Sequence, residues 1–186
     1  MITLIYGGSG SGKSAFAEDY VCKMNCKDRF YLATMKSNDA EAKARIEKHR
    51  NLRSGKGFVT LEHDTDIVNA IKAIEEIDSG SFYTNAGDND TVILLECMSN
   101  LVANEMFRDG EIKSADACVH KVLTDVKEIA GAVSSLVIVT NNIFDDGIAY
   151  DMGTKEYMRA LGKVNRKLAE MAEEVYEVVV GIGIKL

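Results

Sequence analysis

The stretch GGSGSGKSAF, residues 7–16, directly follows a short apolar run, ITLIY, at residues 2–6. Glycine and serine pack poorly in a core, but they let a loop curve so that its backbone N–H groups point inward at an anion. Helix-forming residues begin at Lys13, so the loop lies between a predicted strand and a predicted helix. This order, with the spacing G-x4-G-K-S from Gly7 to Ser14, matches the phosphate-binding loop of nucleotide-binding proteins. A flexible Gly/Ser turn is the competing interpretation.

The phosphate-binding motif predicts a role for the residues of the loop. Backbone N–H groups and the dipole of the following helix attract phosphate oxygens, Lys13 places a positive charge near the β- and γ-phosphates, and Ser14 is a ligand for Mg²⁺. The predicted phosphate-binding residues are Gly7, Gly8, Ser9, Gly10, Ser11, Gly12, Lys13 and Ser14. In such folds a second apolar strand often ends in an acid that supports the metal, and the run TVILLE ends in Glu96. Glu96 could equally be a capping acid.

Outward from the loop, short apolar runs alternate with longer amphipathic ones, which predicts an α/β layered domain with a mostly parallel sheet and helices on both faces. Runs such as TVILLE and LVIVT are apolar on both faces, as strands covered by helices on each side tend to be. The predicted strands are residues 2–6, 29–34, 91–95, 136–140 and 175–184. The predicted helices are residues 13–26, 39–53, 66–77, 97–107, 115–132 and 155–174. The polar stretches 78–90 and 145–153 are predicted to be surface loops.

Length and composition bound the class of protein. A chain of 186 residues, 46% apolar and 27% charged, is expected to form one domain over residues 1–186. No stretch is long and apolar enough to span a membrane, and the first residues do not have the pattern of a secretory signal. The four cysteines are not spaced as zinc ligands, which favours reduced thiols in a cytoplasmic protein.

Charge is distributed unevenly along the chain. The net charge of −7 argues against a nucleic-acid partner. The basic segment, residues 36–56, nevertheless contains seven Lys or Arg and three acids. Such a segment predicts a local anion site, although a solvated helix face is the alternative.

A histidine lies within this basic segment. Arg45, His49 and Arg53 recur every four residues of a predicted helix, so they share one face, and Arg50 is adjacent to His49. Guanidinium groups one turn away disfavour the cationic form of the histidine, and a neutral imidazole is a competent nucleophile. Spacing alone is also compatible with an ordinary surface histidine.

Three stretches, taken in order and spacing, resemble the bifunctional adenosylcobinamide kinase / adenosylcobinamide-phosphate guanylyltransferase family of cobalamin biosynthesis. They are GGSGSGKS at residues 7–14, the segment 30–62, and LLECMSNLVANEMF at residues 94–107. The segment 30–62 is the specific one, through the pattern D-x-E, R-I-x-x-H-x-x-x-R and T-x-E. The resemblance extends from the first predicted strand to the closing GIGIKL.

The resemblance implies a RecA-like P-loop fold and a homotrimer. It implies a kinase step, in which ATP or GTP phosphorylates the aminopropanol hydroxyl of the corrinoid adenosylcobinamide, and a step in which GTP transfers GMP through His49 to the phosphorylated corrinoid. His49 and Lys13 are then catalytic, with Mg²⁺ held by Ser14 and Glu96. Beyond the loop, the implied nucleotide-binding residues are Ala33, Thr34, Met35, Arg45, Arg50, Asn51, Leu52, Arg53, Glu62 and Glu96.

Two other functions remain open from the sequence. A P-loop small-molecule kinase without guanylyltransferase activity would form no covalent nucleotide adduct. A nucleotide-binding regulatory protein that has lost catalysis would bind GTP without turning over a corrinoid.

Overall fold

The structure is a computed structural model that describes residues 1–36, 47, 53–77, 90–143 and 150–186. Within these residues seven strands form one sheet in the order β3-β2-β4-β5-β1-β6-β7. Every neighbouring pair is parallel except β6 and β7. The strands are β1 (Ile2–Gly7), β2 (Asp28–Ala33), β3 (Phe58–Glu62), β4 (Thr91–Glu96), β5 (Ser135–Asn141), β6 (Glu174–Val179) and β7 (Ile182–Lys185).

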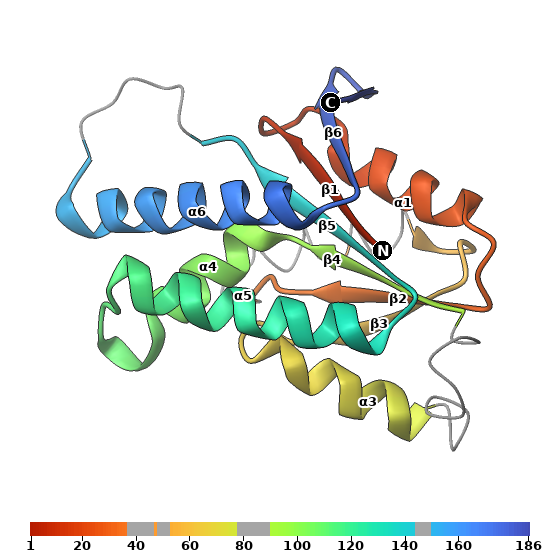
Figure 1. Ribbon diagram of the computed structural model, residues 1–186, viewed down its shortest axis with the longest axis horizontal. Helices are drawn as coiled ribbons and strands as arrows, with labels where there is room; N and C mark the ends of the chain where they lie inside the picture. The colour runs from red at the N-terminus through yellow and green to blue at the C-terminus, as the bar shows by residue number, and fades with distance from the viewer. Residues whose placement is uncertain (37–46, 48–52, 78–89, 144–149) are drawn as a thin grey trace.

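Helices cover both faces of the sheet, as predicted (Figure 1). One face packs against α3, α4, α5 and α6 through a core that includes Leu4, Leu95 and Ile138. The other face packs against α1 through a second core that includes Ile5, Val21 and Leu94. The helices are α1 (Lys13–Lys23), α3 (Ala70–Ile77), α4 (Met98–Met106), α5 (Ala115–Ala132) and α6 (Met152–Met171), with 3-10 turns η1 (Ile67–Asn69) and η2 (Arg108–Gly110).

The central strands bury side chains on both faces of the sheet, which explains why they could be predicted from the sequence. β4 and β5 are buried along almost their whole length, and consecutive residues alternate between the two cores. The predicted ranges for β1, β2, β4 and β5 agree with the structure to within one residue at each end. The predicted helix 115–132 coincides with α5.

One strand was missed, one predicted strand was wrong as a single strand, and one predicted helix has shifted ends. β3 was not predicted, although its sequence FVTLE is rich in residues that favour strands; it is an edge strand that buries only Leu61. The predicted strand 175–184 is two antiparallel strands that turn at Val180 and Gly181, both with positive φ. The predicted helix 155–174 starts earlier, at Met152, because Asp151 caps it by accepting from Thr154 N at 3.0 Å, and it ends at Met171.

The ends of other predicted helices also shifted. α1 ends at Lys23 instead of residue 26, and the segment predicted as one helix from residue 66 is the turn η1 followed by α3. Of the predicted helix 39–53 only Glu47 and Arg53 lie among the described residues, and most of the predicted loops 78–90 and 145–153 lies outside them. In the part of the chain that the structure describes, no helix combines the length and the apolar character that crossing a membrane requires.

Candidate functional site

The glycine loop connects the carboxyl end of β1 to the first residue of α1, as the sequence predicts. Gly12 caps α1 with φ 87°, a conformation that favours glycine, and a Cβ there would lie 3.0 Å from Gly181 Cα. The turn between β6 and β7 therefore packs directly on the loop, and Gly181 N donates a hydrogen bond to Ser11 O at 2.7 Å. This contact holds the loop from the side of the C-terminal hairpin.

Lys13 folds back over its own loop. Its ammonium donates to Gly8 O at 2.9 Å, and the residue is only 7% exposed. Burial lowers the pKa of Lys13, while the nearby Glu96 carboxyl opposes that shift. The side chain thus positions a poorly hydrated positive charge inside the loop, where a phosphate oxygen could replace the backbone carbonyl as its partner.

Ser14 and Glu96, the two predicted metal ligands, are brought together by the fold. Ser14 Oγ donates to Glu96 Oε1 at 2.8 Å, although 82 positions separate them in sequence. Glu96 Oε2 is buried and has no hydrogen-bond partner among the described residues. Burial raises the pKa of Glu96 to about 7, and the hydrogen bond from Ser14 and the charge of Lys13 only partly offset it. A carboxylate oxygen of this kind beside a hydroxyl is a donor set that suits a hard divalent cation.

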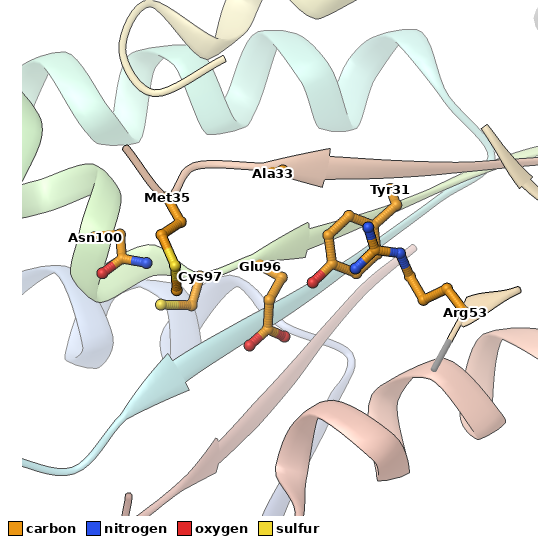
Figure 2. Close-up of a pocket in the computed structure, with 7 residues that line it drawn as sticks. All are labelled: Tyr31, Ala33, Met35, Arg53, Glu96, Cys97 and Asn100. Carbon is orange, nitrogen blue, oxygen red and sulfur yellow. The ribbon is translucent and has the colours of Figure 1, made fainter. Parts of the chain in front are cut away.

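Glu96 also lines a small cavity of about 40 Å³ with residues from β2 and β4 (Figure 2). Of the predicted nucleotide-binding residues, Ala33, Met35 and Arg53 line this cavity, and Thr34 joins its two strands. Thr34 Oγ1 donates to Cys97 O at 2.8 Å and accepts from Cys97 N at 2.9 Å. Thr34 is fully buried, so it fixes the spacing of the strand ends around the cavity.

Arg53 contributes a buried cation to the same cavity. Its guanidinium lies over the ring of Tyr31, 3.4 Å from the centroid, as Figure 2 shows. Arg53 is 7% exposed, and within the described ranges its buried Nη1 has no hydrogen-bond partner. A solvated helix face is therefore wrong as an account of Arg53. Buried polar atoms of this kind are rare in folded proteins, and a bound ligand is one of their explanations.

Other predicted residues are placed differently. Glu62 is exposed on β3, level with Ala33 on β2 and Glu96 on β4, but it does not line the small cavity. Within the basic segment, Lys56 is used by ion pairs to Glu18 at 2.9 Å and Asp19 at 3.0 Å. Five predicted site residues lie outside the described part of the chain: Arg45, His49, Arg50, Asn51 and Leu52.

Three residues that line the cavity were not predicted from the sequence: Tyr31, Cys97 and Asn100. Tyr31 could have been found, because residues 31, 33 and 35 alternate along one strand and its continuation and so share a face. Asn100 reaches the cavity through a tertiary arrangement that no local pattern indicates.

The chain is similar to known proteins along its full length. The family model described as cobinamide kinase / cobinamide phosphate guanyltransferase, CobU, matches residues 3–186. The bifunctional adenosylcobalamin biosynthesis protein CobU of Escherichia coli (strain K12) is 30% identical, with 100% of this chain and 99% of that protein covered. The protein of the same name from Salmonella typhimurium is 29% identical, with the same coverage of both chains.

A solved structure supports the fold independently. An ATPase domain of known structure superposes with a TM-score of 0.52 at 11% identity, covering 95% of this chain and 68% of that one. This similarity and the mostly parallel sheet confirm the predicted RecA-like P-loop fold. The match over residues 3–186 identifies the chain as a member of the cobinamide kinase / cobinamide phosphate guanyltransferase family.

Proposed function

We propose that this protein phosphorylates the hydroxyl of adenosylcobinamide with ATP or GTP, and then transfers GMP from GTP to the product. The family match and the two relatives named as bifunctional support both activities. The observation that carries the proposal is the hydrogen bond between Ser14 and Glu96, which joins the glycine loop to the end of β4 beside the buried Lys13. The chain has the charges and the oxygen ligands that binding a triphosphate requires.

In the kinase step, the loop from Gly7 to Ser14 would hold the phosphates through its backbone N–H groups. Lys13 would exchange Gly8 O for phosphate oxygens and so offset the negative charge that develops on the transferred group. Phosphoryl transfer depends mostly on positioning and charge stabilisation. Both are supplied here by groups that the fold already holds in place.

Mg²⁺ fits the residues at this site. Ser14 Oγ and the buried Glu96 Oε2 would hold it, since Mg²⁺ takes oxygen ligands and keeps several waters. When bound, it supplies positive charge that neutralises the phosphate oxygens. The raised pKa of Glu96 implies that the carboxyl must lose its proton before it can act as a ligand.

For the guanylyl step, His49 is the proposed nucleophile. Its imidazole nitrogen would bond to the α-phosphorus of GTP while the bond to the bridging oxygen breaks and pyrophosphate leaves. A phosphate oxygen of the phosphorylated corrinoid would then displace the histidine and take the GMP. His49 precedes Arg53 by four residues, and the guanidinium of Arg53 lines the cavity beside Glu96. This arrangement supports a nucleotide bound between the loop and the basic segment.

The remaining nucleotide contacts would come from the ends of β2 and β3 and from the basic segment. We assign them to Ala33, Thr34, Met35, Arg45, Arg50, Asn51, Leu52, Arg53 and Glu62. Because Ala33 is level with both Glu62 and Glu96 across three adjacent strands, a ligand over Ala33 could reach both carboxylates. We also propose a single domain, a homotrimer and a cytoplasmic location, in keeping with the family resemblance.

Intact mass spectrometry after incubation with GTP and Mg²⁺ tests the proposal. We expect an acid-labile, GMP-sized addition that His49→Ala abolishes. The matched controls are His63→Ala and His120→Ala, which remove the other two histidines of the chain and should retain the addition. A wild-type protein that binds GTP and phosphorylates cobinamide without forming the adduct would reduce the function to that of a kinase. GTP binding without either activity would indicate a regulatory protein.

A further inference from the structure

A second, larger cavity opens beside the glycine loop. It has a volume of about 570 Å³, and Gly8 and Ser9 form one of its walls. Resting on the proposed function, we propose that this cavity is the acceptor subsite of the kinase step, where the hydroxyalkyl arm of the corrinoid enters. The described residues that line it all lie outside the basic segment, residues 36–56.

The position of the cavity relative to the phosphates carries the inference. The ammonium of Lys13, which marks the place of the β- and γ-phosphates, lies 2.9 Å from the carbonyl of Gly8. Gly8 is at the same time a wall residue of the cavity. Asn142, another wall residue, is joined to the loop because its backbone N donates to Gly7 O at 2.9 Å. The cavity therefore meets the loop near the expected position of the terminal phosphate, which is where the acceptor hydroxyl must bind.

The walls suit an amphipathic organic substrate. Ile143, Tyr150, Tyr157 and Met158 supply apolar and aromatic surface, and Asn142 and Thr154 supply polar groups. A mostly apolar cavity of several hundred Å³ with a few polar groups is the usual composition of a small-molecule site. An apolar wall with hydrogen-bonding groups suits an alkyl amide arm that ends in a hydroxyl.

An apolar surface that could carry the corrin macrocycle lies beside this cavity. Met152, which starts α6 two residues before Thr154, is 74% exposed, and Ile112 and Phe107 are 62% and 44% exposed. A Cβ placed on Gly153 would lie 3.6 Å from Ile112 Cδ1 and 3.7 Å from Phe107 Cε1, so these side chains flank the start of α6. The macrocycle could rest on this surface while its arm reaches the loop.

The wall that contains Tyr157 is hydrogen-bonded to the start of α4, the helix that follows Glu96. Tyr157 Oη donates to Ser99 O at 3.2 Å, and Asn141 Nδ2 donates to Ser99 Oγ at 2.5 Å. Ser99 follows Glu96 by three residues, in the first turn of α4. An acceptor that contacts Tyr157 would therefore have a fixed position relative to Glu96, the proposed metal ligand. Such positioning favours one direction of approach to the phosphate.

Phosphoryl transfer to the hydroxyl depends more on the position of the acceptor than on a strong base. Among the described wall residues none has a carboxylate or an imidazole. In the transfer, the alcohol oxygen bonds to the terminal phosphorus, the bond to the bridging oxygen breaks, the nucleoside diphosphate leaves and the alcohol proton passes to water. A loose transition state needs little proton removal in advance. Thr154 Oγ1, which donates to Asp151 Oδ2 at 2.7 Å, would accept a hydrogen bond from the substrate hydroxyl and so orient it.

Filling the cavity tests the inference. In Thr154→Trp we expect the KM for cobinamide to rise about tenfold or more, because the larger side chain fills the space proposed for the acceptor. The KM for the nucleotide should change less than about twofold. The matched control is Lys155→Trp, the next residue of α6, whose side chain is exposed and does not line the cavity. It should leave both KM values unchanged.

Direct titration of cobinamide, with a non-hydrolysable nucleotide bound, gives the same comparison without turnover. If Thr154→Trp does not fold, Met158→Ala against Lys155→Ala replaces the pair, with weaker cobinamide binding expected only in the former. If the wild type is an active kinase and the two variants of each pair bind cobinamide with equal affinity, the proposed subsite is wrong and the proposed function stands. A wild type that neither phosphorylates nor binds cobinamide would overturn both.

Discussion

Two clusters of buried charge differ in how their charges are compensated. Around the glycine loop, Glu96 Oε2 and Arg53 Nη1 are buried with no hydrogen-bond partner in the described part of the chain. In the cluster of Asp66, Glu105 and Asp125, the three carboxylates lie within 4.8 Å of one another, yet cations surround them. Arg108 and Lys121 contact Asp66 at 2.6 and 2.9 Å, and Lys121 contacts Asp125 at 2.6 Å.

Glu105 shows the contrast most clearly. Its side chain is 1% exposed, and its Oε1 accepts a hydrogen bond from Asp66 N at 2.8 Å. Its Oε2 accepts no hydrogen bond from the described residues. Two cations nevertheless lie near Oε2, Arg108 at 3.8 Å and Lys113 at 3.7 Å. The cluster already holds its own counter-charges, so we assign it to stability. In the loop region, Lys13 and Ser14 offset the burial of Glu96 only in part, which costs stability and is typical of ligand-binding sites. Removing charges in each region should therefore have opposite effects.

The largest expected effect is on catalysis. Lys13→Met should lower kcat of the kinase step by about 10³-fold, because the charge that offsets the terminal phosphates is lost. The melting temperature should not fall, since the buried ammonium is disfavoured in the folded protein. Steady-state kinetics and thermal unfolding of the same preparation check both. A Lys13→Met protein that is as active as wild type but less stable would break the comparison.

The next effect is on stability. Glu105→Ala should lower the free energy of unfolding by about 2 kcal/mol, since it removes the acceptor of the Asp66 backbone N. At a temperature where the variant is folded, kcat should be unchanged. Denaturant unfolding gives the free energy, with Glu170→Ala as the control. That residue pairs with Lys167 at the surface, and its loss should leave the free energy of unfolding close to that of the wild type.

The smallest effect depends on pH. Burial raises the pKa of Glu96 to about 7, so the folded state keeps the proton that the unfolded chain loses near the ordinary value of 4.5. The stability that Glu96 contributes is thus present below pH 4.5 and is lost as pH rises through 7. In metal-free protein, Glu96→Gln should be more stable than wild type by about 1–2 kcal/mol at about pH 8 and by less at about pH 5. Equal differences in the free energy of unfolding at the two pH values would contradict the assignment of a buried carboxyl that is only partly compensated.

The sequence predicted the loop and the central sheet because these elements depend on local pattern. The spacing from Gly7 to Ser14 requires a strand before it and a helix after it, and the strands that follow are buried on both faces. The pairing of Ser14 with Glu96 followed from the expectation that a second apolar strand of such folds ends in an acid that supports the metal. Both features can be read from short stretches of a single sequence.

Other features could not be predicted, because they arise where distant segments meet. The stacking of Arg53 on Tyr31 joins residues 22 positions apart through a tertiary contact, and nothing in their neighbours indicates it. The cavity between Gly8 and Thr154 likewise depends on where α6 starts, which the sequence placed three residues too late. The edge strand β3 was overlooked although FVTLE is rich in strand-forming residues, so this miss does not come from a missing signal.

The contact between Gly181 and the glycine loop has a consequence for how the protein is made. Ser11 and Gly12 are synthesised near the start of the printed sequence, but their packing partner follows some 170 residues later. A nascent chain on the ribosome thus lacks this contact on the loop until the hairpin of β6 and β7 has emerged. Affinity for nucleotide should accordingly be acquired only after that hairpin is made, when most of the sheet has formed.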